Sequence, residues 1–224
     1  MPKPIGANQI SAALAYFNHV RVPACLIAGL SAAGLFTAIP QGSRGKRAHD
    51  VLSTVYIGLL AAAAVLHLTC VFVSTATGVR VMAGGFDPHA TSAVIFLRRE
   101  FEFSYLWTGL SFFSGLESYV CGLAIRAYTS LPGAAGRVSA LLLLATASGM
   151  VAYANQMLVT YSSVGESAAR LIELLLHEVL LRSYAGYVSL GLSALAMASL
   201  ASNACAFLFG AQPPTSVYSK PKAA

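Results

Sequence analysis

Residues 51–75 read VLSTVYIGLLAAAAVLHLTCVFVST, an apolar run without an acidic or basic side chain apart from one histidine. A helix needs about 17–25 such residues to cross a bilayer. Four other stretches have a similar length and character, with few charges. The sequence therefore predicts five transmembrane helices, over residues 22–39, 51–75, 101–128, 138–162 and 183–210.

The composition supports a membrane protein. Hydrophobic residues make up 57% of the chain and charged residues only 10%, and the mean hydropathy is +0.69. A soluble domain would carry about 25% charged residues. We predict an all-α, polytopic membrane helix bundle that forms a single domain over residues 1–211, followed by a flexible tail over residues 212–224.

The charge distribution argues against nucleic-acid binding. The net charge is +6, but the basic residues are scattered beside apolar segments, where lipid headgroups are their natural partners. The 14 Lys and Arg residues divide into seven on each side of the five predicted spans. The positive-inside rule therefore gives no orientation.

A short amphipathic segment precedes the last predicted span. Glu166, Arg170, Glu173 and His177 recur at spacings of four, three and four, which puts them on one polar stripe of a helix. Ser163 and Glu166 have the spacing of a capping box. We expect an interfacial helix over about residues 165–182.

Local signals predict where several helices begin and end. Pro23 is expected near the start of the first helix and Asp50 at the cap of the second, which can run on as far as Met82. A turn is expected at Gly84. The sequence Leu131-Pro132-Gly133 should close the third span.

Small residues recur every fourth position in two of the spans. At this spacing they allow helix backbones to approach closely, either inside the bundle or against a partner subunit. Both interpretations stay open. The residues concerned are Ala24, Ala28, Ala32 and Gly29 in the first span and Ala194, Ala198 and Ser202 in the fifth.

The third span carries a stripe of small polar residues. Ser104, Thr108, Ser111, Gly115 and Ser118 follow one another at alternating spacings of four and three. Their hydroxyls can bond to a helix backbone or can line a water-filled path.

Two ionisable side chains are expected at membrane depth, where charge is costly and by default functional. His67 has three interpretations: a neutral imidazole hydrogen-bonded across helices, an axial ligand of a tetrapyrrole such as chlorophyll or haem, or a group that handles protons or ions. Glu117 is a protonated carboxyl or one paired with Asn155 or Gln156. In an antiparallel pair of helices His67 and Glu117 should differ in depth by about 12 Å.

A metal site has only weak candidates in this sequence. Glu173 and His177 are four residues apart, whereas di-metal carboxylate bundles use Glu and His three apart. Glu100 and Glu102 are predicted on the same side of the membrane. No catalytic or nucleotide-binding pattern occurs, and we expect no enzymatic activity.

His67 is followed seven and eight residues later by Ser74 and Thr75, and the third span adds the acids Glu100 and Glu117. In these features the second and third spans resemble those of the Orai family of calcium-release-activated calcium channels, whose third helix has two acids at a similar spacing. The resemblance implies an oligomeric cation channel whose first helix lines the pore, with Arg21 at its mouth. The first span has no carboxylate, so the family's pore glutamate is absent and altered selectivity is implied.

These observations lead to one main functional hypothesis and two alternatives. The main hypothesis is an accessory or structural subunit of a larger membrane complex, in a thylakoid or mitochondrial inner membrane, with lipid and other subunits as partners. Chlorophyll or haem would then bind at His67. The alternatives are the Orai-like channel and a small proton-coupled transporter that uses Glu117.

Overall fold

The structure is a computed structural model that describes residues 7–37, 46–84, 86, 92–157 and 161–177. All regular elements in these ranges are helices: α1 (Ala7–Leu35), α2 (Lys46–Ala83), α3 (Ala93–Ser130), α4 (Gly133–Met157) and α5 (Val164–Leu175). The chain divides into one compact unit up to Ile172 and a second from Glu173 onward. The predicted all-α class is confirmed for the described residues.

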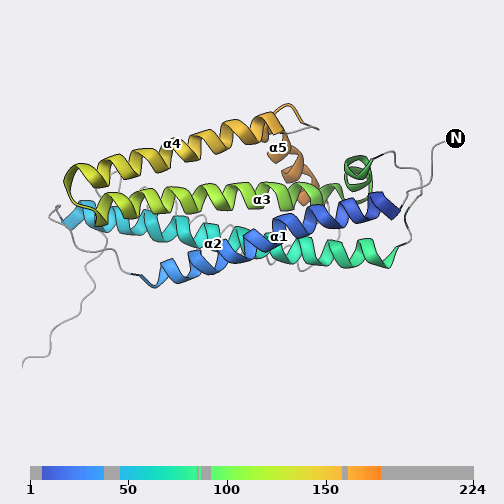
Figure 1. Ribbon diagram of the computed structural model, residues 1–224, viewed down its shortest axis with the longest axis horizontal. Helices are drawn as coiled ribbons and strands as arrows, with labels where there is room; N and C mark the ends of the chain where they lie inside the picture. The colour runs from blue at the N-terminus through green and yellow to red at the C-terminus, as the bar shows by residue number, and fades with distance from the viewer. Residues whose placement is uncertain (1–6, 38–45, 85, 87–91, 158–160, 178–224) are drawn as a thin grey trace, which may run out of the picture. The chain divides into compact units, whose positions relative to one another are not determined.

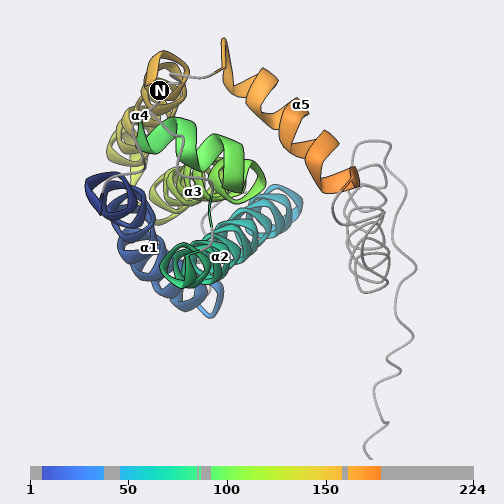
Figure 2. The same ribbon diagram turned by 90° about the vertical axis from the view of Figure 1, so that its right-hand side faces the viewer.

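Helix α3 has neighbours on several sides. It packs against α1, α2 and α4, and α1 and α2 also pack against each other (Figure 1). Helices α2 and α3 run antiparallel, since Leu60 lies against Gly122 and His67 lies against Gly115. Figure 2 looks along the bundle and shows α4 on the outside of α3.

Three helices are long and apolar enough to cross a membrane, at Gln9–Leu35, Asp50–Ala83 and Gly133–Asn155. Their outer faces expose large apolar side chains: Leu26, Leu68 and Leu141 are 66%, 60% and 65% exposed. A soluble surface would carry few such contiguous apolar faces. The chain is therefore a membrane protein with at least three helices fit to span a bilayer.

The prediction of five spans plus an interfacial helix is only partly correct. The segment 101–128 is helical as part of α3 but is not among the three apolar helices. The physical reason is its central position: a helix surrounded by other helices does not need a lipid-facing surface, so it can carry Ser, Thr and Gly on its buried faces. The predicted span 183–210 lies outside the described residues, as does the end of the interfacial helix.

Helix α1 begins far earlier than its hydropathy predicts. It starts at Ala7, so Pro23 is inside the helix and not near its start. The polar residues Asn18, His19 and Arg21 masked this extension; Asn18 and His19 are exposed, and Arg21 Nη2 donates to Asn18 Oδ1 at 2.7 Å. Proline removes one backbone hydrogen bond inside a helix, the one to the carbonyl four residues earlier.

The predicted cap at Asp50 is also wrong. Helix α2 begins at Lys46, so Asp50 is already in its second turn, where its carbonyl accepts from Thr54 Oγ1 at 2.9 Å. The predicted turn at Gly84 and the predicted ends of α2 and α3 are confirmed. Helix α2 ends at Ala83, Gly84 follows with φ of +75°, and α3 ends at Ser130 just before Leu131.

Helix α3 starts with a short arm that bends away from its long part. The side chain of Ser92 caps the arm by accepting from the Ile95 N–H at 3.2 Å, and Phe101 has a non-helical backbone (φ −138°, ψ 33°). Figure 2 shows the arm crossing the end of the bundle. Phe86, Phe96 and Phe101 pack edge to face there, which anchors the bend in an apolar cluster.

The N-terminus of α5 is capped as its sequence predicts, with one shift. Ser163 Oγ accepts from the Glu166 N–H at 3.1 Å, but the Glu166 carboxylate bonds Ser162 instead of Ser163, at 2.6 Å and 2.7 Å. These bonds from the Ser162 hydroxyl and N–H lower the pKa of Glu166. Their stabilisation is complete above the carboxyl's pKa in the unfolded chain and is lost as pH falls through the lowered folded pKa.

A three-residue polar cluster joins α5 to α3. Arg170 donates from Nε and Nη2 to the two oxygens of Glu102, at 3.2 Å and 3.0 Å, and Tyr161 Oη donates to Glu102 Oε1 at 3.0 Å. Two parallel bonds between guanidinium and carboxylate are stronger and more directional than one. The cluster therefore fixes α5 against the start of the long part of α3.

A double-mutant cycle on Glu102→Gln and Arg170→Met should give a coupling energy of about 1 kcal/mol, because the pair is bidentate and partly shielded from water. The free energy is measured from deuterium uptake by the α5 amides of the purified protein. Glu100→Gln is the matched control, since Glu100 accepts from its own neighbour Arg99 at 2.8 Å. Equal effects of Glu102→Gln and Glu100→Gln would contradict the role of the cluster.

Candidate functional site

The interior between α2 and α3 contains the histidine that the sequence singled out. His67 is fully buried, and its Nδ1 lies 2.7 Å from the carbonyl oxygen of Ala63 on the same helix. Because a carbonyl only accepts, Nδ1 carries the proton and donates it to Ala63. The bond is therefore within α2 and not across helices, and the neutral ring has its lone pair on Nε2.

Helix α3 lies close to the imidazole at Gly115. A Cβ built on Gly115 would lie 2.6 Å from both Cε1 and Nδ1 of His67, a distance that real Cβ atoms do not show. Phe112 packs edge to face on the ring, with 5.8 Å between the ring centroids. Gly115 is thus required by the size of the histidine side chain.

This geometry meets one requirement of tetrapyrrole ligation and not another. The buried Nε2 has no hydrogen-bond partner among the described residues, as an axial ligand needs before it binds iron or magnesium. A flat macrocycle also needs open space at that nitrogen. Since the ring is 0% exposed, chlorophyll or haem could reach Nε2 only if α2 and α3 moved apart, and ligation by His67 stays a prediction.

Glu117 points to a different part of the bundle. It is half-buried and lines a hollow of about 90 Å³ between α3 and α4, together with Met150, Val151 and Ala154. Within the part of the chain that the structure describes, its carboxyl makes no hydrogen bond or ion pair. An ionisable group in such an apolar hollow is energetically unfavourable and needs a proton or a partner.

The expected 12 Å difference in depth between His67 and Glu117 is wrong. His67 contacts Gly115, two residues from Glu117, so the two levels differ by only about 3 Å. The error arose because α2 continues to Ala83, which shifts the pairing of α2 with α3. The two side chains still do not meet, because His67 of α2 lies against α3 at Gly115, whereas Glu117 of α3 faces the hollow beside α4.

Asn155 has a local role and is not hydrogen-bonded to Glu117. Its Oδ1 accepts from the backbone N–H of Val164 at 2.9 Å, which helps to fix the connection from α4 to α5. The side chain of Gln156, the other predicted partner of Glu117, lies outside the described side chains.

The described ranges contain no group of three His, Cys, Asp or Glu side chains that could hold a metal ion. Glu102 is engaged by Arg170 and Glu100 by Arg99. The weak candidates Glu173 and His177 belong to the second compact unit, and His177 follows α5 in π-helical backbone.

The small residues of α1 divide between two faces. Ala24 and Ala28 are buried, at 0% and 5% exposure, whereas Gly29 is exposed and a Cβ built on it would meet nothing within 4 Å. Ala32 is half-buried. The corresponding residues Ala194, Ala198 and Ser202 lie outside the described residues. One face of α1 therefore packs inside the bundle and the other remains open.

The polar stripe of α3 is largely internal. Thr108, Ser111 and Gly115 are buried, and the carbonyl of Thr108 accepts from Cys70 Sγ at 3.5 Å. Ser118 bonds its own helix at Ser114 O, 2.8 Å away. These contacts are those of helix packing.

Sequence reasoning missed a second polar contact between helices. Arg126 Nη1 donates to the hydroxyl of Tyr56 at 3.1 Å, and that hydroxyl donates to the carbonyl of Gly34 at 3.3 Å. The contact joins α3, α2 and α1 at one end of the bundle. Partners 70 residues apart leave no local spacing that could reveal them.

Comparisons with known proteins give no relative for this chain. No family model, curated protein or solved structure matches it. The functional argument therefore rests on the geometry described above.

Replacing Gly115 with Ala should destabilise the bundle by about 1–3 kcal/mol, because the new methyl group overlaps the His67 ring. Gly29→Ala is the matched control and should be neutral or stabilising by about 0.5–1 kcal/mol, since its methyl group meets no atom and alanine favours the helix. Both are measured by thermal unfolding in mild detergent. Equal stability of the two variants would show that α2 and α3 are not in contact at this point.

Replacing Glu117 with Met should stabilise the isolated protein by about 1–3 kcal/mol, because it removes an unpaired polar group from an apolar hollow. The readout is again the unfolding midpoint in detergent. Glu100→Gln, at an ion-paired position of the short arm, serves as the control. Destabilisation by Glu117→Met would reveal a partner for the carboxyl.

Proposed function

We propose that this chain is a non-enzymatic membrane protein that acts as an accessory or structural subunit of a larger membrane complex. The observation that carries the proposal is a set of mid-helix glycines with no use inside the described bundle. Gly29, Gly58 and Gly149 belong to α1, α2 and α4, and a Cβ on any of them would meet nothing within 4 Å.

Glycine inside a helix is less favourable than alanine by about 0.5–1 kcal/mol. At Gly34, Gly115 and Gly122 that loss has an internal reason, since an added Cβ would lie 2.7, 2.6 and 3.2 Å from a neighbouring side chain. No contact inside the described bundle requires glycine at position 29. Close packing of a helix from another subunit against α1 would require it.

The open face of α1 has the form of a helix-packing surface. Cys25, Gly29 and Ala33 are all exposed and follow one another every fourth residue. In lipid, helix association depends on close packing and not on the hydrophobic effect, so small side chains at this spacing favour a helix partner. We extend the proposal to a thylakoid or mitochondrial inner membrane on the strength of the sequence hypothesis.

The same face supports one alternative, a homo-oligomeric Orai-like cation channel lined by α1. The observation in its favour is that α1 lies at the edge of the described bundle with an uncovered face. Arg21, expected at the mouth of such a pore, lies near the middle of the apolar span Gln9–Leu35. A second alternative, proton-coupled transport, draws on the unpaired carboxyl of Glu117. It requires that Glu117→Gln abolish transport in proteoliposomes.

Extraction of the native membrane with a gentle detergent, followed by size-exclusion chromatography, absorbance spectra and mass spectrometry, separates these functions. The subunit proposal expects this chain to elute in a large complex with other proteins. Pigment absorbance in that fraction, lost on His67→Ala, would support pigment binding. A colourless homo-oligomer would overturn the subunit proposal and favour the channel.

Replacing Gly29 with Leu should release the chain from the complex, because the larger side chain blocks the approach of a partner helix while leaving the bundle intact. Leu30→Phe is the matched control: it enlarges a neighbouring side chain that is already large and 48% exposed. Thermal unfolding of both variants confirms the fold. Retention of Gly29→Leu in the complex would rule out this face of α1 as the contact.

A further inference from the structure

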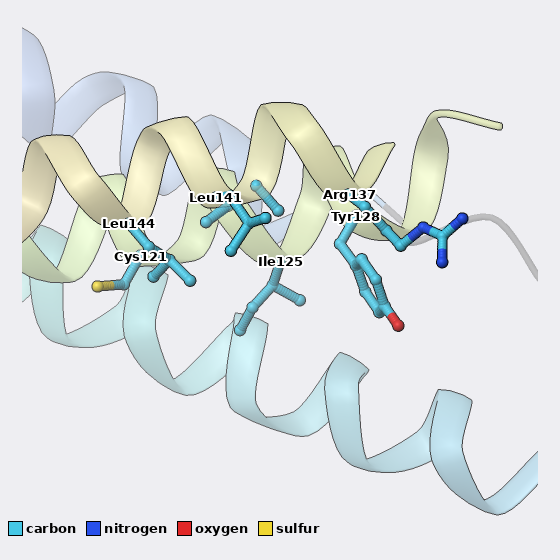
Figure 3. A pocket seen from close by; sticks show the side chains of 8 residues that line it. Cys121, Ile125, Tyr128, Arg137, Leu141 and Leu144 are labelled. Atoms are coloured by element: carbon cyan, nitrogen blue, oxygen red, sulfur yellow. The ribbon is translucent and has the colours of Figure 1, made fainter. Parts of the chain in front are cut away.

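A groove between α3 and α4 has the dimensions of a ligand site. Its volume is about 410 Å³, within the range of about 300–1,000 Å³ that is usual for small-molecule sites. Figure 3 shows the guanidinium of Arg137 and the hydroxyl of Tyr128 toward one end and Cys121 and Leu144 at the other. The lining residues are Cys121, Ala124, Ile125, Tyr128, Arg137, Ala140, Leu141 and Leu144.

The turn between the helices builds the polar end of the groove. Gly133 has φ of +55°, a conformation that other residues rarely adopt, and it starts α4 directly after the turn. A Cβ on Gly136 would lie 2.6 Å from the carbonyl oxygen of Leu131, so only glycine lets α4 pass this close to the end of α3. Arg137 follows Gly136 directly. Because α4 lies so close to the end of α3 here, Arg137 and Tyr128 line the same end of the groove.

The groove runs from one end of a membrane-spanning helix toward its middle. The apolar helix spans Gly133–Asn155, and Arg137 is in its second turn. From Arg137 to Leu144 the helix rises about 10 Å, two thirds of the roughly 15 Å that one leaflet of the hydrocarbon layer measures. A lipid chain that hangs from the interface beside Arg137 would therefore follow the groove.

The chemistry of the groove fits an anionic amphiphile. Arg137 is exposed and has no carboxylate partner within the described ranges, whereas Arg126 at the same end bonds Tyr56 on the α2 side. Guanidinium binds phosphate oxygens with two parallel hydrogen bonds. Below it the exposed Leu141 and Leu144, 65% and 45% exposed, offer apolar surface that is open to lipid.

We propose that this groove is a binding site for an anionic phospholipid, with one acyl chain between α3 and α4 and the phosphate at Arg137. The site requires that α4 crosses the bilayer and is independent of the proposed role as a complex subunit.

The test uses Cys121, which lines the groove, as a reporter. The full chain carrying Cys25→Ser and Cys205→Ser is purified in mild detergent, and its reaction with N-ethylmaleimide is followed by mass spectrometry; Cys70 is buried. Phosphatidylglycerol is added as the anionic probe and phosphatidylcholine as the zwitterionic one. We expect phosphatidylglycerol to slow the labelling of Cys121 at least fivefold, and at lower concentration than phosphatidylcholine.

Two variants separate the headgroup from the acyl chain. Arg137→Gln should weaken phosphatidylglycerol binding about five- to tenfold, the loss of one basic contact with an anionic lipid, while Arg126→Gln should leave the affinity unchanged. Leu144→Trp fills the groove and should abolish the lipid effect with Arg137 intact. Circular dichroism confirms that each variant is folded.

Three results would overturn the proposal. The first is equal protection of Cys121 by the two lipids, which would mean that charge plays no part. The second is equal affinity of the parent protein and Arg137→Gln. The third is a Cys121 that is unreactive before lipid is added, which would mean that protein covers the groove.

Discussion

The contact between α2 and α3 is the constraint on which the described bundle depends. In a bilayer, apolar side chains gain nothing by leaving lipid for protein, so helices hold together through close packing and a few polar contacts. Gly115 lies against His67 and Gly122 against Leu60, and each lets α3 come near α2 where a side chain would hold it off. The bond from Arg126 to Tyr56 closes the same pair at one end.

The central place of α3 explains why hydropathy and position disagree along this chain. Helices α1 and α4 have faces toward lipid and are apolar on them, whereas α3 contacts α1, α2 and α4 and carries Thr108 and Ser111 on buried faces. Glu117 is on the same helix and faces an apolar hollow beside α4, where its carboxyl is energetically unfavourable. The low hydropathy of α3 is therefore a consequence of its contacts with three other helices.

Much of the helical layout could be predicted from the sequence, because it depends on local patterns. The extent of α2 to Ala83, the turns at Gly84 and Leu131, and the cap at Ser163 follow from apolar length, glycine, proline and capping residues. The start of α1 at Ala7 was not predicted, because the polar residues Asn18, His19 and Arg21 interrupt the apolar pattern although the helix continues through them. The Glu102–Arg170 pair joins residues 68 positions apart, and only the tertiary fold brings them together.

The fit of Gly115 to His67 also limits how this sequence can change. Any side chain at 115 larger than a hydrogen atom needs a smaller neighbour at 67, and a smaller residue at 67 leaves a void unless 115 grows to fill it. Each single step is unfavourable and only the pair of steps restores packing. Among descendants of one ancestor, these two positions should therefore remain fixed or change together.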